Sequence, residues 1–98
     1  GISAEELHQK IALKLEGAGS LNNNAGRFGH GLGLQLTEPP SNMPGDNTVI
    51  KPNMVLTIEP SLEYAPGKLM VHEENILITS DGPELLTLRA PEELPIIC

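Results

Sequence analysis

Residues 54–60 read Met-Val-Leu-Thr-Ile-Glu-Pro, a run of apolar and β-branched side chains that ends on a carboxylate and a proline. Such a run is typical of a β-strand, and proline, which has no backbone N–H, ends one. The preceding pair, Pro52-Asn53, suits a type II turn because asparagine accepts a positive φ at the third position. The sequence therefore predicts a strand over residues 54–59 that follows a tight turn.

More strands are expected towards the C-terminus. The pair at 66–67, Pro-Gly, is a second type II candidate, and it predicts that residues 62–64 pair with a long strand over 69–79. The pair at 81–82, Asp-Gly, offers another tight turn into residues 85–88. Short strands joined by tight turns indicate an antiparallel sheet.

A helix is predicted near the N-terminus. Ser3 and Glu6 fit a capping box, in which each side chain accepts a backbone N–H of the other residue. Apolar residues then recur at helical spacing, and the glycines at 17 and 19 end the pattern. The inward residues are Leu7, Ile11 and Leu15, and the outward ones are Gln9, Lys10, Lys14 and Glu16. We expect one amphipathic helix over 4–16 beside the sheet, which makes the fold class α+β.

Two segments are predicted to be loops. Residues 17–26 are rich in Gly, Ser and Asn, including Asn22-Asn23-Asn24, and residues 41–51 lack any periodic pattern. Between them, the prolines at 39 and 40 favour an extended path over a helical one.

Composition excludes several classes of function. The net charge is −7 and the six Lys and Arg residues are scattered, which argues against nucleic-acid binding. The single cysteine, Cys98, rules out an internal disulfide and suits a reducing compartment. The sequence shows neither a secretory signal pattern nor an apolar run of about eighteen residues. We therefore expect a cytoplasmic protein that contacts no membrane.

Three motifs carry residues suited to chemistry. His30 is flanked by glycines that permit close backbone approach to a bound group. Glu59 ends an apolar strand, where an unpaired carboxylate is costly to bury. Glu73 and Glu74 interrupt another apolar run, and as neighbours on a strand they face opposite sides. Counting by twos places Asn75 on the face of Glu73.

Each motif also has an ordinary structural explanation. The histidine could be satisfied by backbone carbonyls, and the glutamates could be solvated at strand ends or edges. Together, however, the motifs supply one imidazole and two carboxylates, a donor set that suits Mn, Co, Fe or Zn. Their joint occurrence predicts part of a hydrolytic metal site built from His30, Glu59 and one acid of the pair Glu73 and Glu74.

The order of these motifs resembles one known family. Five short motifs follow one another along the chain: Gly-His-Gly-x-Gly-Leu at 29–34, Glu-Pro-Pro at 38–40, Thr-Ile-Glu-Pro at 57–60, Glu-Glu-Asn at 73–75 and Asp-Gly-x-Glu-Leu-Leu-Thr at 81–87. This pattern, which runs over about residues 27–94, resembles the pita-bread metallohydrolases. That group comprises methionine aminopeptidases, Xaa-Pro peptidases such as prolidase, and creatinase.

The resemblance implies two pseudo-symmetric α+β halves around two divalent metal ions with five protein ligands. His30, Glu59 and Glu73 match the last three ligands, with Glu59 as proton acceptor, Glu73 bridging the metals and His30 fixing one of them. Two Asp ligands would lie upstream, since Asp46 and Asp81 match no ligand motif. Residues 1–98 would then be the C-terminal part of one catalytic domain. The complete protein would be a homodimer that cleaves a peptide or amide C–N bond.

Several positions depart from the family pattern. Thr37 and Gly26 stand where peptidases of the group often carry further histidines. Val71 replaces a frequent arginine, and Asn53 and Ser61 replace glycines. Two alternatives to an Xaa-Pro peptidase follow, namely a non-catalytic binding module and a creatinase-like or lyase relative on the same scaffold.

Overall fold

The computed structural model describes residues 1–21 and 26–97, in which it has one helix and seven strands. In chain order these are α1 (Ala4–Gly17), β1 (His30–Gly31), β2 (Glu38–Ser41), β3 (Val55–Ile58), β4 (Ser61–Ala65), β5 (Lys68–Val71), β6 (Glu74–Thr79) and β7 (Gly82–Leu85). All strand pairs among the described residues are antiparallel, so the predicted α+β class is confirmed. Residues 22–24 and Cys98, which the sequence analysis considered, lie outside the described residues.

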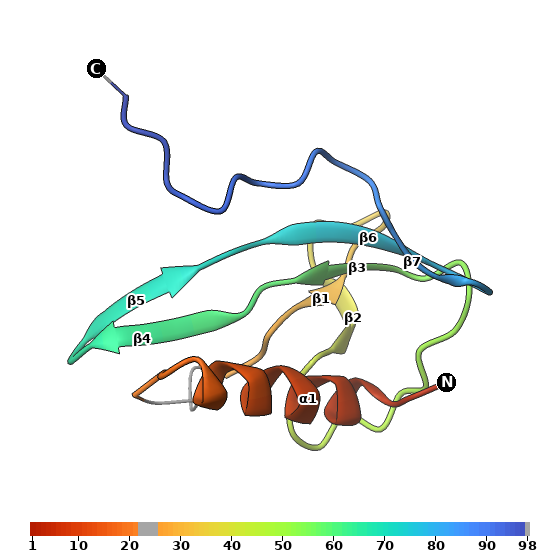
Figure 1. Cartoon of the computed structure of the whole chain (residues 1–98). Helices are drawn as coiled ribbons and strands as arrows, with labels where there is room; N and C mark the ends of the chain where they lie inside the picture. The colour runs from red at the N-terminus through yellow and green to blue at the C-terminus, as the bar shows by residue number, and fades with distance from the viewer. Residues whose placement is uncertain (22–25, 98) are drawn as a thin grey trace.

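The strands form two sheets on one side of α1 (Figure 1). The larger sheet has the order β2-β1-β3-β6-β7, and the smaller is the β4-β5 hairpin. Because β3 leads into β4 and β5 leads into β6, the two sheets are successive parts of one long ribbon. The ribbon is interrupted at residues 59–60 on one side and at 72–73 on the other.

This interruption corrects the predicted continuous strand over 69–79. Pro60 has no N–H to donate, so the regular ladder stops there, and one bond from the His72 N–H to the Pro60 carbonyl, 3.2 Å long, crosses the break. The last strand is also earlier than predicted, at 82–85 instead of 85–88. Both expected type II turns are confirmed by positive φ at their third residues, 74° at Asn53 and 72° at Gly67.

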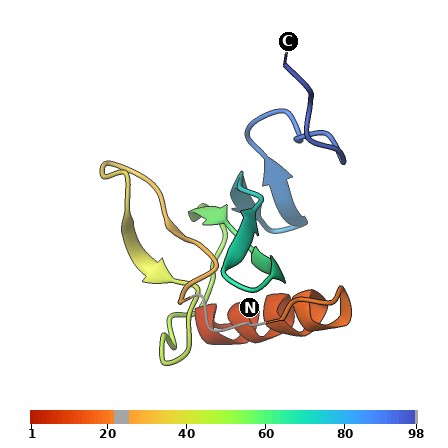
Figure 2. The same ribbon diagram turned by 90° about the vertical axis from the view of Figure 1, so that its left-hand side faces the viewer.

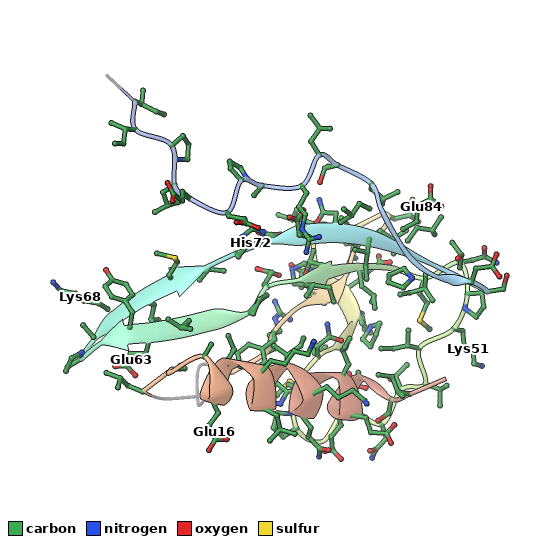
Figure 3. All side chains as sticks on the ribbon, viewed as in Figure 1. Glu16, Lys51, Glu63, Lys68, His72 and Glu84 are labelled. Atoms are coloured by element: carbon green, nitrogen blue, oxygen red, sulfur yellow. The ribbon has the colours of Figure 1, made fainter. Side chains whose placement is uncertain are left out.

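Helix α1 begins with the predicted capping box. The Ser3 N–H donates to Glu6 Oε2 over 2.7 Å, and the Glu6 N–H donates to Ser3 Oγ over 3.2 Å. Ala4, which the helical spacing sets near the inward residues, is buried as expected, but the buried His8 was not predicted. Leu7, Ile11 and Leu15 are only partly buried. Glu16 points away from the sheets, as expected (Figure 3).

His8 belongs to a small core. Its ring stacks on Phe28 with centroids 4.5 Å apart, and Nε2 lies 3.2 Å from the Gly26 carbonyl. The buried apolar side chains are Ala4, Phe28, Ile50 and Leu56. Many large apolar side chains are exposed, including Leu69, Met70 and Val71 of β5. Among the described residues, no helix is both long and apolar enough to span a membrane.

The loop before β3 holds the N-terminus of α1. The N–H groups of Ala4 and Glu5, which have no partner inside the helix, donate to the carbonyls of Thr48 and Asp46 over 2.9 and 2.8 Å. The Asp46 carboxylate in turn accepts the N–H groups of Ser41 and Thr48 over 2.8 and 2.9 Å. One side chain therefore shapes the loop that caps the helix.

Asp46→Asn is expected to lower the stability of the full-length protein by about 1 kcal/mol near neutral pH, because asparagine keeps only one of the two oxygens that accept the Ser41 and Thr48 N–H groups. A hydrogen bond from the Thr48 side chain, followed by those from the Ser41 and Thr48 N–H groups, holds the pKa of Asp46 below its usual value. This stabilisation is present above the ordinary aspartate pKa and is lost as pH falls through the folded-state value. Urea unfolding from about pH 7 to about pH 3 should show the difference from wild type shrinking. Asp81→Asn, which removes an equal charge from the β6–β7 turn, is the control.

Candidate metal centre

The position of His30 depends on the glycines beside it. β1 lies between β2 and β3, and the arm of β1 and β2 stands at the side of the molecule (Figure 2). A Cβ on Gly29, where φ is +139°, would lie 2.0 Å from the Thr57 carbonyl oxygen, and one on Gly31 would lie 2.2 Å from that of Pro39. The glycines therefore permit a close approach of the neighbouring strands. It fixes the backbone of a histidine that is only 9% exposed.

The His30 ring is oriented by its own strand. Nδ1 lies 2.8 Å from the Gly31 carbonyl, which can only accept, so Nδ1 carries the proton. In the neutral ring Nε2 then has a lone pair, and it faces Glu59 Oε2 at 3.0 Å. Two acceptors this close require a proton or a cation between them. Metal-bound histidines have the same arrangement, in which one ring nitrogen donates its proton and the other offers its lone pair to the ion. A backbone carbonyl, the ordinary explanation for this histidine, thus satisfies Nδ1 but leaves Nε2 unexplained.

Glu59 follows β3 at the break in the ribbon. Its N–H donates to the Phe28 carbonyl over 2.9 Å, and its carboxylate accepts the Thr57 hydroxyl over 2.6 Å. The side chain is 26% exposed, so it is not simply solvated at a strand end. Thr57, which the sequence analysis did not select, also accepts the His30 N–H over 3.0 Å. Its signal was available, because it stands two residues before Glu59 on the same face of the strand.

Glu73 lies at the opposite side of the break, between β5 and β6. Although exposed, it lines a pocket of about 310 Å³ together with His30 and Glu59. The other lining residues are Leu32, Leu36, Thr37, Thr57 and Asn75. Asn75 Oδ1 is buried and has no hydrogen-bond partner in the described part of the chain. The three residues predicted from separate motifs therefore line one pocket together with Asn75.

Glu74 takes a different environment from its neighbour. Its Oε1 lies 2.9 Å from His72 Nε2 and accepts the Ala90 N–H over 3.2 Å. The His72 hydrogen bond, followed by that from Ala90, holds the pKa of the Glu74 carboxyl below its usual value. His72 lies on the side of the ribbon nearer the C-terminal segment, and neither residue lines the pocket (Figure 3). The assignment of Glu73 as the metal ligand stays a prediction.

The pocket fits part of a metal site but not a complete one. Over residues 1–21 and 26–97, no three His, Cys, Asp or Glu side chains are arranged closely enough to hold a metal ion. One imidazole nitrogen and two carboxylates nevertheless suit a borderline or hard divalent ion. Neither Asp46 nor Asp81 lines the pocket. Further ligands would have to come from sequence beyond these residues.

The pocket wall contains residues that sequence reasoning treated differently. Thr37 was singled out because the family often has a histidine at this position. It lies in the pocket wall, so the wall contains one imidazole, that of His30, where many relatives would have two. Leu32 and Leu36 were not selected. They lie in the irregular segment between β1 and β2, where no periodic pattern indicates which side chains turn inward.

Comparisons with known proteins identify the family and the fold of the chain. The sequence matches the model of metallopeptidase family M24 over residues 1–80. A Mycobacterium tuberculosis protein named "Probable dipeptidase PepE" is 31% identical over 97 residues, which make up 99% of this chain and 26% of that protein. The structure of Xaa-Pro dipeptidase from Bacillus anthracis is similar with a TM-score of 0.83 and 30% identity, over 99% of this chain and 27% of that one. The structure of prolidase from Pyrococcus horikoshii is similar with a TM-score of 0.82 and 34% identity, over 94% of this chain and 26% of that one.

The chain thus spans about a quarter of the length of these relatives. Its fold is that of the matching part of the prolidases, which confirms the expected pita-bread architecture for this portion. The family match extends over 80 of the 98 residues and includes all three motifs. The chain therefore belongs to metallopeptidase family M24.

Proposed function

We propose that the protein containing this chain is a metal-dependent hydrolase of the Xaa-Pro dipeptidase or aminopeptidase type, and that residues 1–98 form the C-terminal part of its catalytic domain. The observation that carries the proposal is the meeting of His30, Glu59 and Glu73 in one pocket, with His30 Nε2 only 3.0 Å from Glu59 Oε2. The names of the relatives, dipeptidase and prolidase, support the reaction class.

The three residues would hold two divalent ions together with two aspartates from the upstream part of the domain. Manganese, cobalt, iron and zinc all suit this donor set, and manganese is the ion we propose to test first. Bound divalent ions supply a nucleophilic water at neutral pH and an electrophile for the carbonyl oxygen of the scissile amide.

The side chains of this chain have separate tasks in the proposed reaction. The Gly31 carbonyl fixes the His30 ring so that Nε2 faces the pocket. Glu59 Oε2 is engaged by Thr57, so Oε1 is the oxygen that would take the proton from the attacking water. Leu32 and Leu36 would form an apolar wall against the substrate's side chains.

The setting of the reaction follows from the same resemblance. We propose a cytoplasmic homodimer that acts on small peptides, in which the upstream half of the domain covers the exposed apolar side chains. The net charge of −7 disfavours nucleic acid as a partner.

One observation favours a second candidate. Thr37 lines the pocket at the position where related peptidases often have another histidine, and an alcohol hydroxyl does not exchange protons at neutral pH as an imidazole does. A creatinase-like or lyase reaction, or a binding module without catalysis, would tolerate this change better than a peptidase.

Chelator treatment of the purified full-length protein is expected to abolish hydrolysis of Gly-Pro, and added Mn²⁺ should restore it. Gly-Ala, a dipeptide without proline, measures the preference for Xaa-Pro bonds. Metal binding without cleavage of either dipeptide would favour the module or the alternative reactions. Cleavage that survives complete metal removal would contradict the proposal.

A further inference from the structure

We propose that Thr57 is a positioning residue of this centre, whose hydroxyl fixes the Glu59 carboxylate relative to the His30 strand. The inference rests on the proposed function, because it concerns how that function's ligands are held. It assigns a role to a residue that coordinates nothing itself.

The direction of the Thr57 hydroxyl follows from its two contacts. Oγ1 accepts the backbone N–H of His30 over 3.0 Å, and this group can act only as a donor. A hydroxyl has one proton to give, and Glu59 Oε2, which can only accept when ionised, lies 2.6 Å away. The proton therefore points at the carboxylate, and the short distance is typical of a charge-assisted hydrogen bond.

The surroundings prevent the hydroxyl from turning elsewhere. Thr57 is 1% exposed, and its β-branched side chain has few accessible rotamers. It lies within β3 and pairs with Asn75 of β6, while its carbonyl oxygen lies 3.4 Å from Asn42 Nδ2. The hydroxyl is therefore almost shielded from bulk water, although Thr57 contributes to the pocket wall.

The contacts close a ring through both candidate ligands. The His30 backbone bonds to Thr57, Thr57 bonds to Glu59 Oε2, and the same oxygen lies 3.0 Å from His30 Nε2. Without the hydroxyl, the Glu59 carboxylate would be free to rotate about its terminal torsions, and the His30 N–H would be buried without a partner. His30 Nε2 and Glu59 Oε2 would then no longer be held 3.0 Å apart before the ion binds. Metal binding would have to order the Glu59 side chain, and this would weaken the affinity.

Thr57→Val in the full-length protein tests the inference, because valine keeps the shape of threonine and replaces the hydroxyl with a methyl group. Affinity for Mn²⁺, measured by titration calorimetry after chelator treatment, is expected to fall about 10 to 100-fold, the usual cost of losing a group that orients a ligand. For Gly-Pro hydrolysis kcat should fall while KM changes less than about three-fold. Thr57→Ser, which keeps the donor, should stay close to wild type in both.

Thr79 provides a matched control within the same sheet. Its hydroxyl donates to the Gly82 carbonyl over 2.6 Å and accepts the Asp81 N–H over 3.2 Å, but it does not line the pocket. Thr79→Val should lower Tm without changing Mn²⁺ affinity. If Thr57→Val does not fold, Thr57→Ala measures the same loss of the hydroxyl.

The outcomes separate this inference from the proposed function. Tight Mn²⁺ binding by wild type and Thr57→Val alike would overturn the role of Thr57 and leave the proposed function standing. Equal losses in Thr57→Ser and Thr57→Val would show that packing, not the hydroxyl, matters, and would also overturn it. A wild-type protein that binds no divalent ion tightly would overturn both.

Discussion

Glu73→Gln in the full-length protein is expected to lower kcat/KM by about 100 to 1,000-fold, the range found when one charge-stabilising group is removed from a hydrolytic site. Glutamine keeps the size of the side chain but lacks the negative charge that a bridging ligand must supply. Glu73 lines the pocket with His30 and Glu59, so the loss falls on the proposed centre itself. Steady-state kinetics on Gly-Pro at saturating Mn²⁺ measures it, and Mn²⁺ affinity should fall in parallel.

Glu74→Gln is the matched comparison, since it makes the same chemical change one residue away. Glu74 is engaged by His72 and by the Ala90 N–H outside the pocket, so we expect a loss of at most about ten-fold. Equal losses from the two substitutions, or a larger one from Glu74→Gln, would mean that the site uses the other acid.

The elements that local rules control were predictable from the sequence. Each of these elements depends on a few adjacent residues. They are the capping box of Ser3 and Glu6, the positive φ at Asn53 and Gly67, and the strand after residue 54. The division of residues 68–79 into two strands was not predictable in this way. It depends on Pro60, which lies opposite in the ribbon and removes a donor that the facing strand would otherwise use.

The pocket shows the same distinction between local and long-range information. His30, Glu59 and Glu73 stand out because each is a polar residue in an apolar segment, and alternation along the strand also placed Asn75 beside Glu73. Leu32 and Leu36 could not be found, because side-chain direction in an irregular loop is set by tertiary contacts. Alternation also places Thr57 on the face of Glu59, but the role of its hydroxyl became clear only from its two hydrogen bonds.

The register of β3 and β6 explains why the two glutamates can serve one pocket. In an antiparallel pair, directly opposite residues have their side chains on the same face. Thr57 pairs with Asn75 and Ile58 with Glu74, so the same register carried one residue further sets Glu59 opposite Glu73, and both line the pocket with His30. Strand register therefore shapes the site as well as the fold.

A protein consisting of residues 1–98 alone is expected to bind Mn²⁺ more than about 100-fold more weakly than the full-length protein and to hydrolyse no Gly-Pro. Within the described residues, His30 and Glu59 approach each other, but no third acidic, His or Cys side chain completes a metal site. The exposed apolar side chains of β5 should also make this protein self-associate. Calorimetry with Mn²⁺ and analytical ultracentrifugation over a range of concentrations measure both effects, with the full-length protein as control. Tight binding of two ions by a monomer of these residues would show that the upstream half is not needed to complete the centre.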